Sequence, residues 1–129
     1  MKKFELDRVR EECGVFGVSN HEDAATLVAL GLHALQHRGQ EGCGIVSFDG
    51  KNFHSEKKQG LVSDHFTKIN VINKLPGKSS IGHNRYSTTG ETSLRNIQPF
   101  FADLYGGGLS LAHNGNLTNA ISLREDLVK

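Results

Sequence analysis

Cys13 is the residue in this sequence whose position most favours chemistry. It follows a charged stretch that ends at Glu12, and it opens an apolar run at residues 13–18 that is typical of a buried strand. If the bond between Glu12 and Cys13 were cleaved, one residue would hold both a thiol nucleophile and a free α-amine, so the base would come with the nucleophile. The alternative is a packed core cysteine, because free cysteine is among the most buried residue types.

Arg85 is a second candidate, in a segment that begins as a strand and ends in a small polar loop. Residues 81–90 place its guanidinium among hydroxyl groups and glycines. There it can hold an amino-acid carboxylate through two parallel hydrogen bonds. Considered alone, the segment favours a structural ion pair with an internal Asp or Glu.

Asn114 and Gly115 follow a predicted strand and form the third candidate. An Asn-Gly pair often makes a tight hairpin turn, but the residues after Gly115 resemble the start of a helix, not a return strand. The functional interpretation uses the Asn114 amide and the Gly115 N–H as two donors aimed at a developing oxyanion. Glycine at 115 would also allow close approach of the backbone.

The composition limits the class of protein. The 129 residues suit one domain with a real core, and the net charge of +1 comes from interspersed basic and acidic residues, so nucleic acid is not an expected partner. No apolar stretch approaches the roughly 20 residues needed to span a bilayer, so we expect no membrane association. Residues 1–12 lack the apolar segment of a secretory signal. Two cysteines without an export signal suggest free thiols, and we expect a cytoplasmic protein.

Strands and helices must alternate to position these candidates. The apolar runs and turn residues predict strands at residues 15–18, 44–48, 52–55, 80–84 and 109–112. Asp49 and Gly50 predict the turn between the second and third of these strands.

Two helices complete the predicted elements. The first is capped by Asn20, with Asp23 three residues later, and ends before Gly39. It is apolar nearly all round, so we expect it to be covered on both sides. The last helix is capped by Asn116 or Thr118.

In this order and spacing, the segments resemble the class II glutamine amidotransferase domain, of the N-terminal-nucleophile hydrolase type. The general marks are Cys-Gly-x-x-Gly from Cys13, Arg-Gly at 38–39, Arg-Tyr-Ser-Thr at 85–88 and His-Asn-Gly at 113–115. The resemblance covers nearly the whole chain.

Finer marks indicate a branch of this family. Residues 35–42, 60–64 and 112–119 resemble the amidotransferases that use phosphoribosyl pyrophosphate. The sugar-phosphate aminotransferase relatives tend instead to have Tyr-Arg-Gly-Tyr-Asp after the first helix and Arg-Trp-Ala-Thr in the arginine loop.

The resemblance implies an α+β fold, a four-layer αββα sandwich that is incomplete at the C-terminal end of this chain. It implies a leader at residues 1–12, removed autocatalytically, and a partial glutaminase domain at 13–129, with the phosphoribosyltransferase domain absent. The implied roles are Cys13 as nucleophile, Asn114 and Gly115 as oxyanion hole, Arg85, Thr88 and Gly115 as substrate-binding residues, and Arg38 and Tyr86 as supports of the site.

The implied function is release of ammonia from the glutamine side chain. Full-length members transfer it to phosphoribosyl pyrophosphate and form 5-phosphoribosylamine, the first step of de novo purine biosynthesis. The expected partners are glutamine, phosphoribosyl pyrophosphate through the absent domain, and further copies in a homo-oligomer at full length. No cofactor is expected in this chain; magnesium and, in members with a leader, a 4Fe-4S cluster belong to the second domain. His33 and His37 are four residues apart on a helix, but no further ligand completes a metal site.

Two departures from the family affect the expected activity. The family Asp that binds the glutamine α-amine is not present before Lys129, and neither is the phosphoribosyltransferase domain. We therefore expect the isolated chain to be inactive. The alternatives are a non-catalytic remnant of this enzyme and the glutaminase domain of another class II amidotransferase.

Overall fold

A computed structural model describes residues 13–39, 41–86, 93–115 and 117–129 of the chain. The predicted leader at residues 1–12, the predicted substrate-binding residue Thr88 and the predicted cap Asn116 lie outside the described residues.

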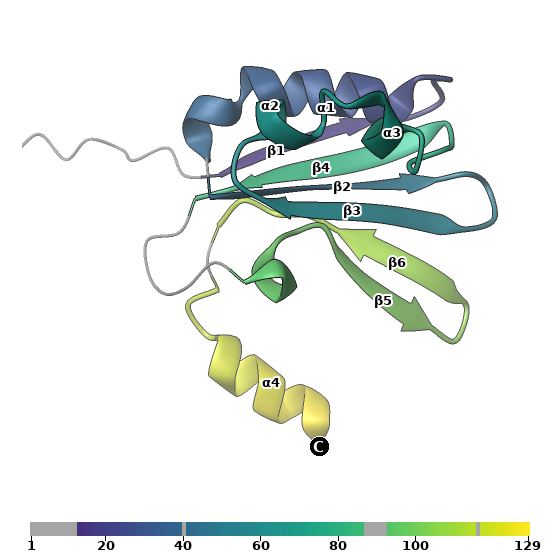
Figure 1. The fold of residues 1–129 in the computed structure, drawn as a ribbon. Helices are drawn as coiled ribbons and strands as arrows, with labels where there is room; N and C mark the ends of the chain where they lie inside the picture. The colour runs from purple at the N-terminus through teal and green to yellow at the C-terminus, as the bar shows by residue number, and fades with distance from the viewer. Residues whose placement is uncertain (1–12, 40, 87–92, 116) are drawn as a thin grey trace, which may run out of the picture.

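An antiparallel sheet of four strands forms the centre of the fold (Figure 1). Its strands are β1 (Gly14–Val18), β2 (Gly42–Phe48), β3 (Phe53–Gln59) and β4 (Ser79–Arg85), in the order β1-β4-β2-β3. The predicted turn joins β2 to β3, where Asp49 Oδ1 accepts hydrogen bonds from the N–H groups of Lys51 and Asn52. Because β4 lies between β1 and β2, its residues, including His83 and Arg85, lie in the interior of the sheet.

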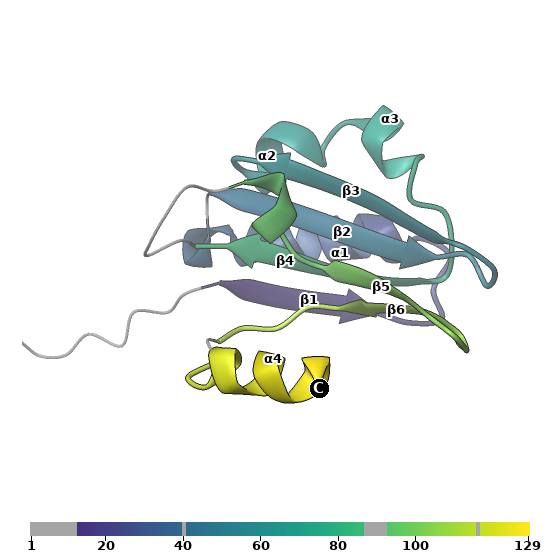
Figure 2. The same ribbon diagram turned by 90° about the horizontal axis from the view of Figure 1, so that it is seen from below.

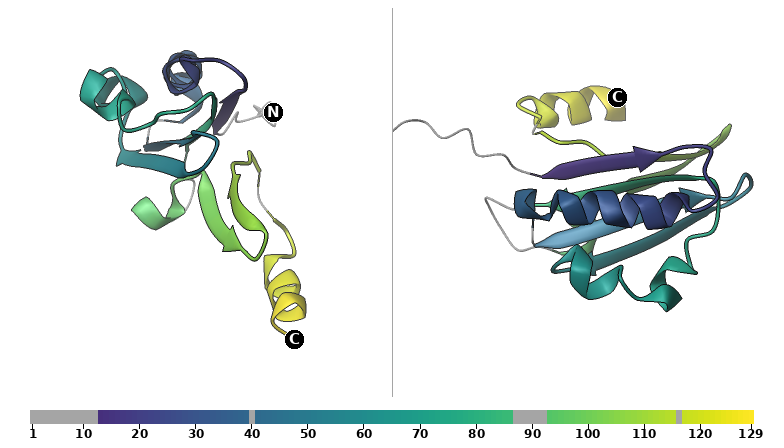
Figure 3. Two further views of the ribbon diagram at one scale, coloured as in Figure 1. Left: turned by 90° about the vertical axis from the view of Figure 1, so that its right-hand side faces the viewer. Right: turned by 90° about the horizontal axis from the view of Figure 1, so that it is seen from above.

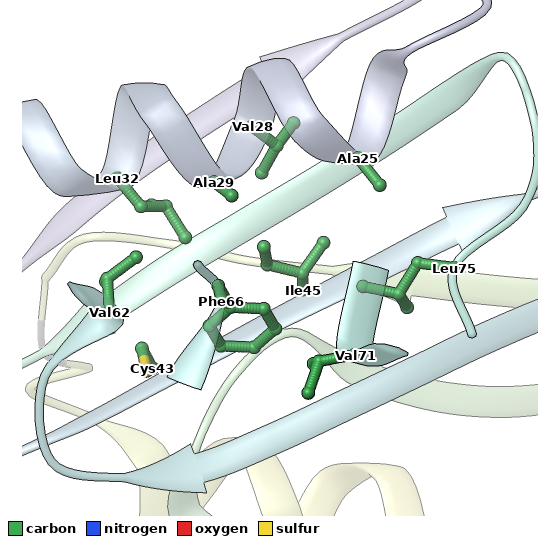
Figure 4. Close-up of a cluster of buried hydrophobic side chains, with 10 residues drawn as sticks. All are labelled: Ala25, Val28, Ala29, Leu32, Cys43, Ile45, Val62, Phe66, Val71 and Leu75. Carbon is green, nitrogen blue, oxygen red and sulfur yellow. The ribbon is translucent and has the colours of Figure 1, made fainter. Parts of the chain in front are cut away.

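Helices cover one face of this sheet. They are α1 (Ala24–Ala34), the 3-10 turn η1 (Gln36–Arg38), and the single-turn helices α2 (Val62–His65) and α3 (Ile69–Ile72). The hydrophobic core lies between α1 and the sheet, closed on one side by α2 and α3 (Figure 4). Its members are Ala25, Val28, Ala29, Leu32, Cys43, Ile45, Val62, Phe66, Val71 and Leu75.

The opposite face of the sheet meets a second, smaller sheet. The 3-10 turn η2 (Leu94–Asn96) leads into β5 (Phe100–Leu104), which pairs with β6 (Gly107–Leu111), and α4 (Ala120–Val128) follows. Viewed along the strands, the layers run from α1, through the main sheet and the β5–β6 hairpin, to α4 (Figure 3). From below, the hairpin crosses the main sheet (Figure 2). The elements follow the predicted αββα order, with two strands in the second sheet and with every residue of α4 exposed.

Several details differ from the sequence predictions. Helix α1 begins after Asp23, whereas Asn20 has a left-handed φ of 59° and does not cap it. Helix α4 begins after Asn119, so Thr118 is not its cap. Helix α1 is covered by the described residues on one side only, since Leu30 on its outer side is 60% exposed.

Candidate active site

Cys13 lies immediately before β1, beside the turn that follows α1. Its backbone N–H donates to the Arg38 carbonyl at 2.9 Å, and Arg38 Nε donates in return to the Cys13 carbonyl at 2.7 Å. Cys13 also has a φ of 63°, a left-handed conformation that costs a non-glycine residue about 1–2 kcal/mol. Arg38 therefore binds both the N–H and the carbonyl of Cys13. These two hydrogen bonds hold the Cys13 backbone in an unfavourable left-handed conformation.

The thiol of Cys13 contacts the backbone of Tyr86, just past the end of β4. Tyr86 N–H donates to Sγ at 3.5 Å, and Sγ lies 3.7 Å from the Tyr86 carbonyl oxygen. β1 and β4 are antiparallel neighbours with Gly14 opposite Asn84. The start of β1 and the end of β4 therefore meet, and the pairing itself brings the thiol to Tyr86.

Asn114 reaches the same point from the end of the second sheet. Its Nδ2 donates to the Cys13 carbonyl at 3.4 Å, across 101 residues of sequence. Gly115, next to it, has a φ of 147°, and a Cβ there would meet no atom within 4 Å. Glycine is thus required at 115 by backbone conformation and not by lack of space. The alternative of a tight hairpin turn at Asn114 is wrong, because β6 ends at Leu111 and the next element among the described residues is the helix α4.

Gln98 supports this loop and was not anticipated from the sequence. It is 7% exposed, and its Oε1 accepts a hydrogen bond from the His113 N–H at 2.7 Å. Its backbone passes directly over Gly44 of β2, where a Cβ would lie 2.1 Å from the Gln98 carbonyl oxygen. A single polar residue outside any motif gives no sequence signal for such a role.

Arg85 ends β4 on the face of the main sheet opposite α1. Its Nη1 donates to the Asn96 carbonyl at 2.9 Å, and its buried Nε has no hydrogen-bond partner among the described residues. The turn η2 therefore fixes one side of the guanidinium. Such an anchored group suits a planar carboxylate ligand.

The second cysteine has a different environment. Cys43 lies in the core, and burial, with a smaller contribution from Asp64, raises the pKa of its thiol to about 12. It is a packed residue of strand β2. Only the thiolate is a nucleophile, so Cys43 does not compete with Cys13.

Within the described ranges, no group of three or more His, Cys, Asp or Glu side chains is arranged to hold a metal ion. In the same ranges, no helix has the length and apolar character to cross a bilayer.

Together, these contacts gather a thiol, an amide donor and an anchored guanidinium at one end of the sheets. A thiol with donors beside it can attack a carbonyl carbon and stabilise the oxyanion that forms. Of the predicted site residues, Cys13, Arg38, Tyr86 and Asn114 are joined by direct hydrogen bonds.

The chain is similar to curated amidophosphoribosyltransferases. It is 61% identical over 122 residues to the one from Rhizobium etli and 48% identical over 124 residues to the one from Bacillus subtilis. These alignments cover 95% of this chain but 25% and 26% of the relatives. The chain therefore spans about a quarter of the length of these relatives.

Solved structures agree with these sequence matches. A structure described as the allosteric regulatory enzyme of purine biosynthesis superposes with a TM-score of 0.81 at 46% identity, covering 88% of this chain and 24% of that one. The Bacillus subtilis glutamine phosphoribosylpyrophosphate amidotransferase complexed with ADP and GMP gives 0.78 at 45% identity, with the same coverage. These matches confirm the predicted N-terminal-nucleophile hydrolase fold and the predicted branch.

The family described as glutamine amidotransferases class-II matches residues 13–127, from the candidate nucleophile almost to the last residue. The chain belongs to the class-II glutamine amidotransferases.

Proposed function

We propose that the chain is the glutamine-hydrolysing part of an amidotransferase, with Cys13 as its nucleophile. The observation that carries this proposal is the meeting at Cys13 of Arg38, Tyr86 and Asn114, three residues from separate elements. A packed core cysteine would need none of these polar contacts. Arg85 would bind the α-carboxylate of glutamine, and Thr88 would contact the substrate.

The reaction begins with attack of Cys13 Sγ on the side-chain amide carbon of glutamine. The α-amine of Cys13 takes the thiol proton and delivers it to the leaving nitrogen, so the carbon–nitrogen bond breaks and ammonia departs. Water then attacks the glutamyl thioester, and glutamate leaves as the thiol re-forms. The hydrogen bond from Cys13 N to the Arg38 carbonyl would hold the amine in place through both steps.

Asn114 Nδ2 and the Gly115 N–H would stabilise the oxyanion in each step. In this structure Nδ2 contacts the Cys13 carbonyl at the long distance of 3.4 Å. On substrate binding, Nδ2 would donate to the oxyanion instead, because catalytic hydrogen bonds are often formed fully only in the substrate complex. A donor of this kind is worth about 3–4 kcal/mol in the transition state.

The free amine requires removal of residues 1–12. We infer that Cys13 performs this step. Its Sγ attacks the carbonyl carbon of Glu12, the peptide carbon–nitrogen bond breaks to give a thioester and a free α-amine, and water hydrolyses the thioester to release the leader. The left-handed φ of Cys13 supports the inference, because backbone strain at a reacting residue can be released by the reaction.

The activity of the whole protein is proposed from its relatives. Ammonia would displace pyrophosphate from phosphoribosyl pyrophosphate and form 5-phosphoribosylamine, the first step of purine biosynthesis. That reaction, magnesium, a 4Fe-4S cluster and homo-oligomer formation belong in this proposal to the part of the relatives outside the aligned region. The described residues offer no cluster that fits either metal group. A cytoplasmic location is part of the same proposal.

The test is a hybrid protein in which residues 1–129 replace the matching segment of the Rhizobium etli relative. We expect glutamine-dependent formation of 5-phosphoribosylamine, and its loss in Cys13→Ser. The same reaction with added ammonia shows that the rest of the hybrid is folded. Glutamine-dependent activity that survives Cys13→Ser would contradict the proposal.

A further inference from the structure

His83 is a buried polar residue with no assigned role. It lies in the middle strand β4 and is 1% exposed. Neither ring nitrogen has a hydrogen-bond partner among the described residues. An unpaired buried polar group destabilises a fold, so a fold retains one only where something compensates.

The strand pairing places His83 on the face of the sheet that carries the site. Asn84, the next residue, donates from Nδ2 to the Leu32 carbonyl of α1, so it faces the helices. Because side chains alternate along a strand, His83 faces the second sheet. Its partners across both neighbouring strands are Val15 and Gly44.

Residues 113–115 are called the oxyanion loop below. Gly44, opposite His83 on β2, lies against Gln98, which in turn binds this loop. The backbone of Gln98 passes over Gly44 so closely that a Cβ there would lie 2.1 Å from its carbonyl oxygen. The Gln98 side chain then accepts the His113 N–H at 2.7 Å. The residue before Asn114 is thus held over the part of the sheet where His83 lies.

The His83 ring is neutral at ordinary pH and can donate one N–H. Burial lowers its pKa to about 4; the backbone of His113 opposes this effect, and the charges of His113 and Arg85 add to it. The His113 backbone raises the His83 pKa, which means that its carbonyl oxygen favours a proton on the His83 ring. The His113 backbone therefore lies close enough to influence the His83 pKa, but no hydrogen bond joins it to the ring in this structure.

We propose that His83 is a positioning residue for the segment 113–115, donating from its ring to the backbone of His113. Gln98 holds the N–H of His113, so a bond from His83 to the backbone oxygen would hold both main-chain groups of one residue. Asn114 and Gly115 follow directly and would be fixed relative to Cys13. This inference rests on the proposed function, because a misplacement of about 1 Å at a catalytic donor can cost about 10²-fold in rate.

The first test measures exchange of the His113 amide proton by NMR in the full 129-residue chain. His83→Phe keeps a ring of similar size without nitrogens, whereas His83→Gln keeps an N–H donor. We expect exchange of the His113 amide to be at least about tenfold faster in His83→Phe, and His83→Gln to restore most of the protection. Amides of β2 and α1 should change by less than about twofold.

Three results would overturn the proposal. They are an unprotected His113 amide in the wild-type chain, no change in His83→Phe, or equal acceleration throughout β2 and α1, which would mark a packing role only. His54→Phe is the matched control, because His54 pairs with Asp49 at the β2–β3 turn and should leave His113 unaffected.

The second test uses the hybrid protein and separates this inference from the proposed function. In His83→Phe we expect kcat with glutamine to fall about 10–100-fold and KM to change less than about threefold, with partial recovery in His83→Gln. A rise in KM alone would contradict a role in the oxyanion loop. If the wild-type hybrid shows no glutamine-dependent reaction, the proposed function fails, and the exchange of the His113 amide still decides the role of His83.

Discussion

The two faces of the main sheet differ in what they bury. The face under α1 buries aliphatic side chains such as Leu32 and Ile45, each fully enclosed. Among the described residues, the buried polar atoms without hydrogen-bond partners are both ring nitrogens of His83 and Arg85 Nε on the other face, and Asn84 Oδ1 alone on the helix face. The first arrangement stabilises the fold, and the second holds polar groups ready for a ligand at some cost in stability. Because side chains alternate along β4, Asn84 faces the helices while its neighbours His83 and Arg85 face the site.

The largest expected effect lies on the helix face. Leu32→Ala removes a fully buried side chain and should lower the free energy of unfolding by about 3–5 kcal/mol. Leu30→Ala, on the exposed side of the same helix, should change it by less than about 1 kcal/mol. Urea unfolding of both variants measures the difference. Equal losses would mean that the outer side of α1 is also covered.

The two cysteines should differ in their reactivity towards alkylating reagents. The pKa of Cys43 rises from 9.0 to about 12, which reduces its thiolate fraction about 10³-fold. Iodoacetamide at pH 8 should therefore label Cys43 about 10³-fold more slowly in the folded chain than in urea. Cys13, half-buried, should label in the folded chain. Peptide mass spectrometry reads both sites, and rapid folded-state labelling of Cys43 would show that the core is open.

On the site face, the expected effects are on catalysis and not on stability. In the hybrid protein, Asn114→Ala should lower kcat about 10²–10³-fold with little change in KM, because an oxyanion donor acts mainly in the transition state. Arg85→Ala should instead raise KM, because the carboxylate is held in ground and transition states alike. Steady-state kinetics separates the two roles. A change in KM alone for both variants would show that they are assigned wrongly.

A smaller effect should appear in the pH dependence of stability. The pKa of His83 is lowered from 6.5 to about 4 by burial, so the unfolded chain binds more protons between these pH values. Stability should fall as pH drops from 6.5 towards 4, by no more than about 3 kcal/mol, and level off below 4. Urea unfolding of His83→Gln should lack this component of the pH dependence. An identical pH profile in wild type and variant would contradict a neutral buried His83.

The sequence predicted the two faces unequally. Apolar runs gave β1, β2, β4 and α1, and Asp49-Gly50 gave the hairpin turn, because these signals are local. The helices α2 and α3 are four residues each, too short for a helical period to show. Strand β5 is exposed throughout and has no alternating pattern of burial, so it was not predicted.

The site was predicted through its motifs, since its geometry is not local. The contact between Cys13 and Asn114 spans 101 residues, and no periodic pattern predicts such a pairing. Gln98 and His83 act through burial and backbone contacts, which single residues do not reveal in sequence. Local patterns therefore indicated the scaffold. Motif resemblance indicated the candidate reacting groups, with Arg38 and Tyr86 as their supports, and the structure adds Gln98 and His83.

The most direct test of the proposed site is the intact mass of the active hybrid protein. The free amine of Cys13 is the proposed base, so the active form should begin at Cys13, having lost residues 1–12 without added protease. Cys13→Ala should retain residues 1–12 and show no glutamine-dependent reaction. A fully active protein that still carries Met1 or Glu12 would contradict the free-amine mechanism.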